Sequence, residues 1–297
     1  MRRHLLYTSI VLACTLAFAA CSKSSQSSTA PASPESGASA EATAAAPATG
    51  GSPGMAASSS PGATAAATAA ASAAVAAPLA SGATPQVSFT DIQGIFAEQQ
   101  IKDLAQLGVF DVTSGAFTPD GTIKRSEFAR WLVKANNALY ADTPAKQIRP
   151  AEGTEQAFVD VPPSHPDYKY VQALANAGFV VGVDEKHFAP DQDLTREEMI
   201  AIKVPVDLGG DPYKNTGLAD VRAAFPFSDV DKISRRYYDA IYGDNFDGSK
   251  NITRVFGQVR TFQPQRAVTR SDAAQCISTI GNYTPRSATE ALARPAQ

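Results

Sequence analysis

Three arginines recur in the sequence at a fixed distance from an aromatic residue. Arg125, Arg196 and Arg270 each stand eight positions after a Phe that begins a Phe-x-Pro sequence. Pro fixes its own φ and keeps the preceding residue out of the helical region, so each arginine follows an extended segment and opens the next helix. The aliphatic part of an Arg side chain packs while its guanidinium faces outward. We therefore expect three guanidinium groups positioned to meet an anion.

A second motif, Phe-x-Asp followed by Val or Ile, precedes each of these arginines. Its aspartates are Asp91, Asp160 and Asp229, and the Phe residues that open successive copies are 69 residues apart. Two motifs in a fixed order, present three times, indicate an internal repeat. A purely structural role stays open for both residue types, because the aspartate can pair with the arginine or cap the first helix.

Each copy is expected to hold two helices joined by a loop. Apolar residues at i, i+3, i+4 and i+7 follow the arginine in copies 1 and 3, and the same spacing precedes Gly108 and Gly178. Glycine at such a place is typical of a helix end. Pro205 is expected to kink or end the second helix of copy 2 early.

The starts of the second helices differ in their capping residues. Thr195 and Glu198 match a capping box, and Thr269 with Asp272 imitates it with a shorter acid. Copy 1 has Lys124 at the cap position, so its helix start is expected to be weaker.

The order of these motifs resembles the S-layer homology family, whose signature combines Phe-x-Asp-Val, a Gly and Phe-x-Pro with Thr-Arg-x-Glu. The likeness covers about residues 87–285 in three copies, with the boundaries 87–145, 154–210 and 223–285. Copy 3 departs from the pattern, with Gln265 in place of Asp and Asp272 in place of Glu. The resemblance implies a mainly α fold in which three helix-loop-helix repeats pack as one pseudo-threefold unit, since one repeat alone buries too little apolar surface.

The same resemblance implies non-covalent binding to an acidic polysaccharide attached to peptidoglycan, with no catalytic activity. The motif aspartates and arginines would then line grooves between repeats. These candidate glycan-binding residues are Asp91, Arg125, Asp160, Arg196, Asp229 and Arg270. A sugar carboxylate suits the bidentate guanidinium, and sugar hydroxyls can donate to a carboxylate.

Two other functions are weighed against wall binding. One is a protein-interaction module that docks an envelope partner. The other is an enzyme of wall metabolism, which is less favoured because the assigned segments leave no stretch for a catalytic domain. No metal-ligand spacing, nucleophile motif or phosphate loop occurs, so no catalytic residue, metal or cofactor is predicted. The net charge of −3 argues against nucleic acid as a partner.

The start of the chain has the layout of a bacterial lipoprotein signal. Residues 1–20 have a basic beginning and an apolar run of 16 residues, shorter than the roughly 20 that a spanning helix needs. The sequence before Cys21 looks like a lipobox, so we expect Cys21 to carry lipid; the alternative is an ordinary cleaved signal with an incidental Cys. Ser22 follows, which favours the outer membrane facing the periplasm over the outer face of the plasma membrane.

The segment between this signal and the repeats is expected to be a disordered linker. Residues 21–86 are mostly Ala, Ser, Thr, Pro and Gly and cannot bury a core. Such a coil has an r.m.s. span of roughly 45 Å and a fully extended reach of about 200 Å. That reach suits a tether from a membrane to the wall. At the other end of the chain, residues 286–297 are expected to form a tail after the third copy.

Cys276 is the remaining cysteine of the mature chain. It occupies the helix position of Trp131 and Ile202 in the other copies, so we expect a core residue rather than a nucleophile. With only Cys21 besides it, no internal disulfide is expected.

Overall fold

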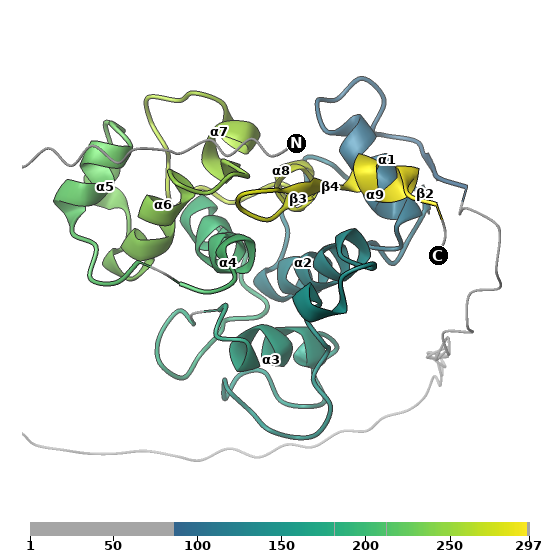
Figure 1. Ribbon diagram of the computed structural model, residues 1–297, viewed down its shortest axis with the longest axis horizontal. Coiled ribbons are helices and arrows are strands. Elements are labelled where there is room, and N and C mark those ends of the chain that lie inside the picture. The colour runs from purple at the N-terminus through teal and green to yellow at the C-terminus, as the bar shows by residue number, and fades with distance from the viewer. Residues whose placement is uncertain (1–85, 181, 212, 296–297) are drawn as a thin grey trace, which may run out of the picture. The chain divides into compact units, whose positions relative to one another are not determined.

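A computed structural model describes residues 86–180, 182–211 and 213–295 of the chain (Figure 1). The expected signal peptide, residues 1–20, the lipidation site Cys21 and the linker up to residue 85 lie outside the described residues. Within the described part, none of the helices is both long enough and apolar enough to span a bilayer.

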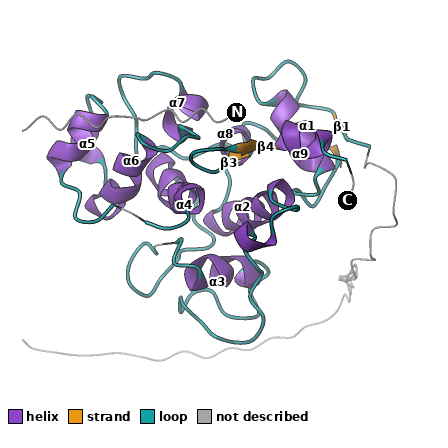
Figure 2. Ribbon diagram, viewed as in Figure 1, coloured by secondary structure: helices purple, strands orange, loops and turns teal. Residues whose placement is uncertain are grey.

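The described residues form mainly helices, which confirms the expected mainly α class (Figure 2). The helices of copies 1 and 2 are α1 (Glu98–Gln106), α2 (Arg125–Leu139), α3 (Tyr168–Asn176) and α4 (Arg196–Leu208). The later helices are α5 (Leu218–Ala224), α6 (Tyr238–Asp244), α7 (Asn251–Phe256), α8 (Arg270–Ile277) and α9 (Ala288–Ala293). Short 3-10 turns are η1 (Pro144–Lys146), η2 (Val230–Lys232) and η3 (Arg235–Tyr237).

The strands are only two residues long. β1 (Ser88–Phe89) pairs in parallel with β2 (Ser114–Gly115), and β3 (Thr279–Ile280) pairs antiparallel with β4 (Arg286–Ser287). β1 and β2 join the segments before and after α1, and β3 and β4 form a hairpin after α8.

Local chemistry sets the start of the three second helices. α2, α4 and α8 begin at the motif arginines, which confirms the predicted position of those residues. Glu198 accepts the backbone N–H of Thr195 at 2.9 Å, and the Thr269 hydroxyl accepts the backbone N–H of Asp272 at 3.1 Å. Lys124 makes no side-chain capping bond, as expected for copy 1.

Pro205 does not end its helix, contrary to the expectation of an early stop. α4 runs through Pro205 to Leu208 and ends at Gly209, which has a left-handed φ of 71°. Pro205 lies in the last turn, so its missing N–H removes a single helical bond. Val204 and Val206 on either side are buried and keep the turn packed.

Three of the later helices were not predicted. α5 begins in the stretch between copies 2 and 3, α7 lies between the two expected helices of copy 3, and the expected tail 286–297 contains α9. α9 starts with a capping box, in which the Ser287 hydroxyl accepts the Glu290 N–H at 3.2 Å and Glu290 accepts the Ser287 N–H at 2.9 Å. The Ser-x-x-Glu sequence was a signal that could have revealed this helix.

The three copies are joined by a closed ring of backbone hydrogen bonds. Ile123, Leu194 and Val268 each lie six residues after the Phe of the Phe-x-Pro motif and are fully buried. The Leu194 N–H donates to Ile123 at 2.9 Å, the Val268 N–H to Leu194 at 2.8 Å, and the Ile123 N–H to Val268 at 3.4 Å. Each copy therefore donates to one neighbour and accepts from the other.

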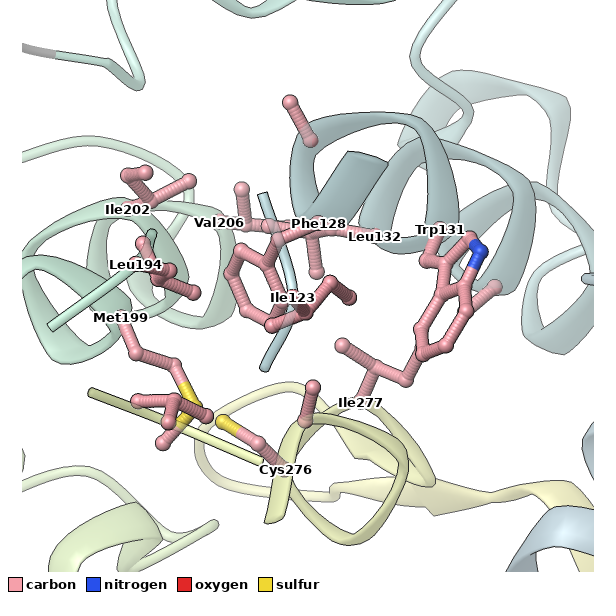
Figure 3. Close-up of a cluster of buried hydrophobic side chains, with 14 of the residues drawn as sticks. Ile123, Phe128, Trp131, Leu132, Leu194, Met199, Ile202, Val206, Cys276 and Ile277 are labelled. Carbon is pink, nitrogen blue, oxygen red and sulfur yellow. The ribbon is translucent and has the colours of Figure 1, made fainter. Parts of the chain in front are cut away.

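The core gathers around this ring (Figure 3). Phe128 from α2, Met199 from α4 and Cys276 from α8 point into it, and all three are fully buried. The expectation that Cys276 is a core residue is confirmed. The core is thus shared by all three copies rather than divided among them.

Candidate functional site

The motif aspartates hold the backbone of the Phe-x-Pro loops. Asp160 accepts the N–H of Phe188 at 2.9 Å with one oxygen and that of Ala189 at 2.7 Å with the other. Asp91 and Asp229 make the same pair of bonds in their own copies, with lengths of 2.7 to 2.8 Å. The residue after each Phe has a left-handed φ, namely Thr118 at 59°, Ala189 at 58° and Gln263 at 55°.

These paired bonds explain why non-glycine residues keep a left-handed backbone. That conformation costs of order 1–3 kcal/mol for a residue with a Cβ and persists only when its surroundings enforce it. Two bonds from a carboxylate to adjacent N–H groups are charge-assisted and supply that enforcement. In copy 1 the N–H of Phe117 also holds the pKa of Asp91 below its ordinary value.

The motif arginines bind the same loops from the neighbouring copy. Arg125 Nε donates to the carbonyl of Phe188 at 2.7 Å, Arg196 Nη1 to that of Phe262 at 2.9 Å, and Arg270 Nε to that of Phe117 at 2.9 Å. The three contacts run from copy 1 to 2, from 2 to 3 and from 3 to 1. Each motif Phe therefore has its N–H held by its own Asp and its carbonyl held by the preceding copy's Arg.

Two of the arginines also have an acidic partner from the next copy. Arg125 Nη1 lies 3.1 Å from Glu198, and Arg270 Nη1 lies 2.8 Å from Glu127. Glu198 is the Glu of the Thr-Arg-x-Glu motif in copy 2, and Glu127 occupies the same position in copy 1. The corresponding residue of copy 3 is Asp272, one methylene shorter, and Arg196 has no carboxylate within 4.0 Å among the described residues.

Arg196 therefore carries an uncompensated charge in a partly buried place. Burial is the main cause that lowers the pKa of Arg196, the nearby Arg266 adds to it, and the carboxylate of Asp272 opposes it. The Arg196 guanidinium lies 4.1 Å from the centre of the Phe256 ring, and its buried Nε has no hydrogen-bond partner in the described part. A ligand carboxylate at this junction would supply the missing anion.

Exposure distinguishes the six predicted residues. Arg125 is fully buried over the Phe188 ring, so the expectation of an outward guanidinium is wrong for it. Asp229 is also buried, whereas Arg196 and Arg270 are half-buried. In the described residues the motif aspartates and arginines make no ion pairs with one another, and the aspartates hold loop N–H groups rather than capping the first helices. Neither structural alternative foresaw this arrangement.

Arg266 and Phe256 are the site residues that sequence reasoning missed. Arg266 stands where copies 1 and 2 have Gly121 and Gln192, and its backbone carbonyl accepts the Arg196 N–H at 3.0 Å. Comparing the three copies position by position would have shown a cation unique to copy 3. Phe256 belongs to α7, a helix that was not predicted at all.

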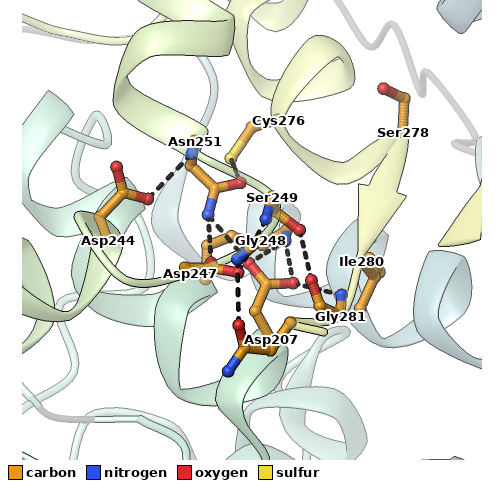
Figure 4. A network of polar contacts seen from close by, with 12 residues as sticks. Asp207, Asp244, Asp247, Gly248, Ser249, Asn251, Cys276, Ser278, Ile280 and Gly281 are labelled. Carbon is orange, nitrogen blue, oxygen red and sulfur yellow. Dashed lines mark hydrogen bonds and ion pairs between the residues drawn. The ribbon is translucent and has the colours of Figure 1, made fainter. Parts of the chain in front are cut away.

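A second cluster of ionisable side chains lies between α4, α6 and α7 (Figure 4). Lys203 and Asp207 form an ion pair that is fully closed to solvent. Asn251 donates to both Asp207 and Asp247 at 2.9 Å, and burial together with the charge of Asp207 raises the pKa of Asp247 to about 8. Asp247 therefore keeps its proton at neutral pH.

The rest of this cluster is also committed to internal contacts. Asp244 accepts the N–H groups of Asn251 and Ile252 at the start of α7, and burial raises its pKa. Cys276 lies 3.8 Å from Asn251 and burial raises its pKa to about 12, which leaves the thiol unreactive at neutral pH. The side chains of this cluster are therefore engaged with one another and hold the fold together.

Comparison with known proteins identifies two segments of the chain. Residues 88–129 and 157–200 match the S-layer homology domain. Over 213 residues the chain is 30% identical to a surface-layer 125 kDa protein of Lysinibacillus sphaericus, and this alignment covers 69% of the chain and 16% of the surface-layer protein. Over 213 residues it is 27% identical to an endoglucanase of Bacillus sp. (strain KSM-635), and this alignment covers 68% of the chain and 20% of the endoglucanase. The chain thus spans a fifth or less of these relatives.

Proposed function

We propose that the repeats form a non-catalytic module that attaches the protein to the bacterial cell wall. The two segments that match the S-layer homology domain indicate a protein of the cell envelope, and domains of this family are wall-binding modules. The closed ring of Ile123, Leu194 and Val268 supports the packing of residues 87–285 as one pseudo-threefold unit. The ligand in this proposal is an acidic polysaccharide attached to peptidoglycan.

The observation that carries the proposal is the unpaired charge of Arg196. Its counterparts Arg125 and Arg270 each have a glutamate from the next copy, and among the described residues Arg196 has no carboxylate within 4.0 Å. In this proposal the grooves lie between the copies, and the buried Arg125 and Asp229 hold the loops beside them in place. The junction of copies 2 and 3, where Arg266 adds a second cation, then receives the acidic group of the glycan.

The proposal extends to the part of the chain outside the described residues. Lipid on Cys21 would hold one end in a membrane, and residues 22–86 would set the distance to the wall. Because the protein has a Ser after Cys21, we place this anchor in the outer membrane, facing the periplasm. The match to an endoglucanase does not extend the proposal to catalysis, since the aligned region is 20% of that protein.

The test is sedimentation of the purified Cys21→Ser protein with isolated sacculi. Binding is measured before and after hydrofluoric acid removes the attached polymers. We expect binding to untreated sacculi, loss of it after stripping, and at least tenfold weaker binding for Arg196→Ala. Arg222→Ala is the matched control, because Arg222 is exposed on α5 and its replacement also removes one positive charge.

The thermal transition of each variant separates a binding defect from unfolding. Equal weakening by Arg196→Ala and Arg222→Ala would point to nonspecific attraction and reject the assignment of Arg196. Absence of binding to untreated sacculi would reject wall attachment itself and favour a protein partner in the envelope.

A further inference from the structure

A cavity of about 610 Å³ opens where the C-terminal ends of α2 and α4 meet α3. We call it the C-terminal pocket and define it by these helix ends, the segment 145–149 and the loop 281–284 between β3 and β4. Its volume lies within the range of about 300–1,000 Å³ typical of small-molecule sites. The motif arginines and aspartates do not line it, so it is separate from the grooves discussed above.

Two of the additional helices pack on helices of the repeats. α9 packs against α1 and α2, and α7 packs against α4 and α8 (Figure 1). At the junction of α2, α3 and α4 the described part of the chain supplies the segment 145–149 and the loop 281–284, and the cavity remains between them. No helix of the described residues fills this cavity.

The rim of the pocket is positively charged. Lys146 lies 5.0 Å from the centre of the Tyr140 ring, and neither Lys146 nor Arg149 has a carboxylate within 4.0 Å among the described residues. Asp207 also borders the pocket, but its oxygens are held by Lys203, by Asn251 at 2.9 Å and by the Gly281 N–H at 2.9 Å. It therefore leaves the two cations uncompensated.

The remaining lining combines aromatic rings with side-chain amides. Tyr283 is 96% exposed at the tip of the loop, so nothing in the described part covers its ring. Asn176 and Asn282 each use their carbonyl oxygen internally, at 2.7 and 3.0 Å, which leaves their NH2 groups available as donors. Rings pack on the apolar face of a sugar, amides bind its hydroxyls, and basic groups bind an acid substituent.

We propose that the C-terminal pocket is a second ligand site that takes an acidic sugar residue. Arg149 and Lys146 bind the carboxylate, the amides of Asn176 and Asn282 bind hydroxyls, and Tyr283 covers the ring. A small inorganic anion would leave most of the volume unfilled, and a neutral sugar would leave both cations without a partner. The site is independent of the wall-binding role proposed for Arg196.

The test is isothermal titration of the Cys21→Ser protein with D-glucuronic acid, with D-glucose and inorganic phosphate as comparison probes. We expect glucuronic acid to bind at least tenfold more tightly than either comparison probe. Arg149→Gln and Tyr283→Ala each should weaken it at least tenfold, because both side chains are exposed and can change without disturbing the core. Arg222→Gln is the matched control for lost charge, and Arg196→Ala should leave this binding unchanged.

Three results would overturn the proposal. Equal affinity for glucose would remove the role of the two cations, and equal affinity for phosphate would reduce the pocket to a simple anion site. Binding that depends on Arg196 rather than Arg149 would move the ligand to the groove between copies 2 and 3. Sedimentation of Arg149→Gln with sacculi tests the two proposals separately. Wall binding through Arg196 should be unchanged in this variant even when the pocket no longer binds glucuronic acid.

Discussion

Replacement of Asp247 by Asn is expected to stabilise the protein, and by more as the pH rises. Asp247 is fully buried beside the Lys203–Asp207 pair and Asp244. Its pKa is about 8 in the folded protein against an ordinary value of 3.8. Between these two values the unfolded chain releases a proton that the folded protein keeps, so a rise in pH favours unfolding.

The size of the effect follows from the width of that pH window. Each pH unit within it lowers the free energy of unfolding by about 1.4 kcal/mol. As the pH rises from 3.8 to about 8, the free energy of unfolding therefore falls by up to about 6 kcal/mol, and outside this range Asp247 causes no further change. An Asn at position 247 has the same shape as Asp and cannot ionise. The free energy of unfolding of Asp247→Asn should therefore not fall in this way as the pH rises.

The assay is urea unfolding followed by circular dichroism from about pH 5 to pH 8. The free energy of unfolding of Asp247→Asn relative to the unchanged protein should grow by about 4 kcal/mol over that range. Asp231→Asn is the control, since Asp231 is exposed on η2 and its variant should follow the unchanged protein at every pH. Parallel pH profiles for Asp247→Asn and the unchanged protein would refute the reasoning, because Asp247 would then be ionised in the fold.

Three further outcomes are expected from the contacts between copies and in the core. Arg125→Ala should lower the free energy of unfolding by about 3–5 kcal/mol, because it leaves Glu198 and a loop carbonyl without their buried partner; a loss below about 1 kcal/mol in urea unfolding would contradict this. Asp229→Ala should cost about 2–4 kcal/mol in the same assay, because two N–H groups lose a charged acceptor. Cys276 should resist a thiol reagent such as DTNB in the native protein and react fully in urea, since burial raises its pKa to about 12; rapid native labelling would show that α8 opens.

Much of the secondary structure could be predicted from the sequence because its causes are local. The starts of α2, α4 and α8 depend on an extended cap residue and on side chains within four positions of the helix start. The entry before them is not extended throughout as expected, because the residue between Phe and Pro has a left-handed φ in each copy. The ends at Gly108 and Gly178 depend on one residue that tolerates a left-handed φ. Periodic apolar residues predicted which side chains enter the core, Cys276 among them.

The helices that escaped prediction depend on tertiary packing. α5, α7 and α9 are six or seven residues long, too short to be stable without neighbours. α9 is held against α1 and α2, and α7 against α4 and α8. Pro205 stays within α4 for the same reason, because buried neighbours keep its turn packed.

The sequence by itself determined that the two motifs occur three times and which aspartates and arginines recur in them. Only the tertiary structure decided what those residues touch, because each Asp reaches a loop 26 to 34 residues away and each Arg reaches a different copy. The consequence is clearest for Asp272: its shorter side chain belongs to copy 3, but the arginine that lacks a carboxylate partner among the described residues is Arg196 of copy 2. Because the acidic residue of one copy pairs with the arginine of another, the sequence alone does not tell which arginine it contacts; the packing of the copies decides that.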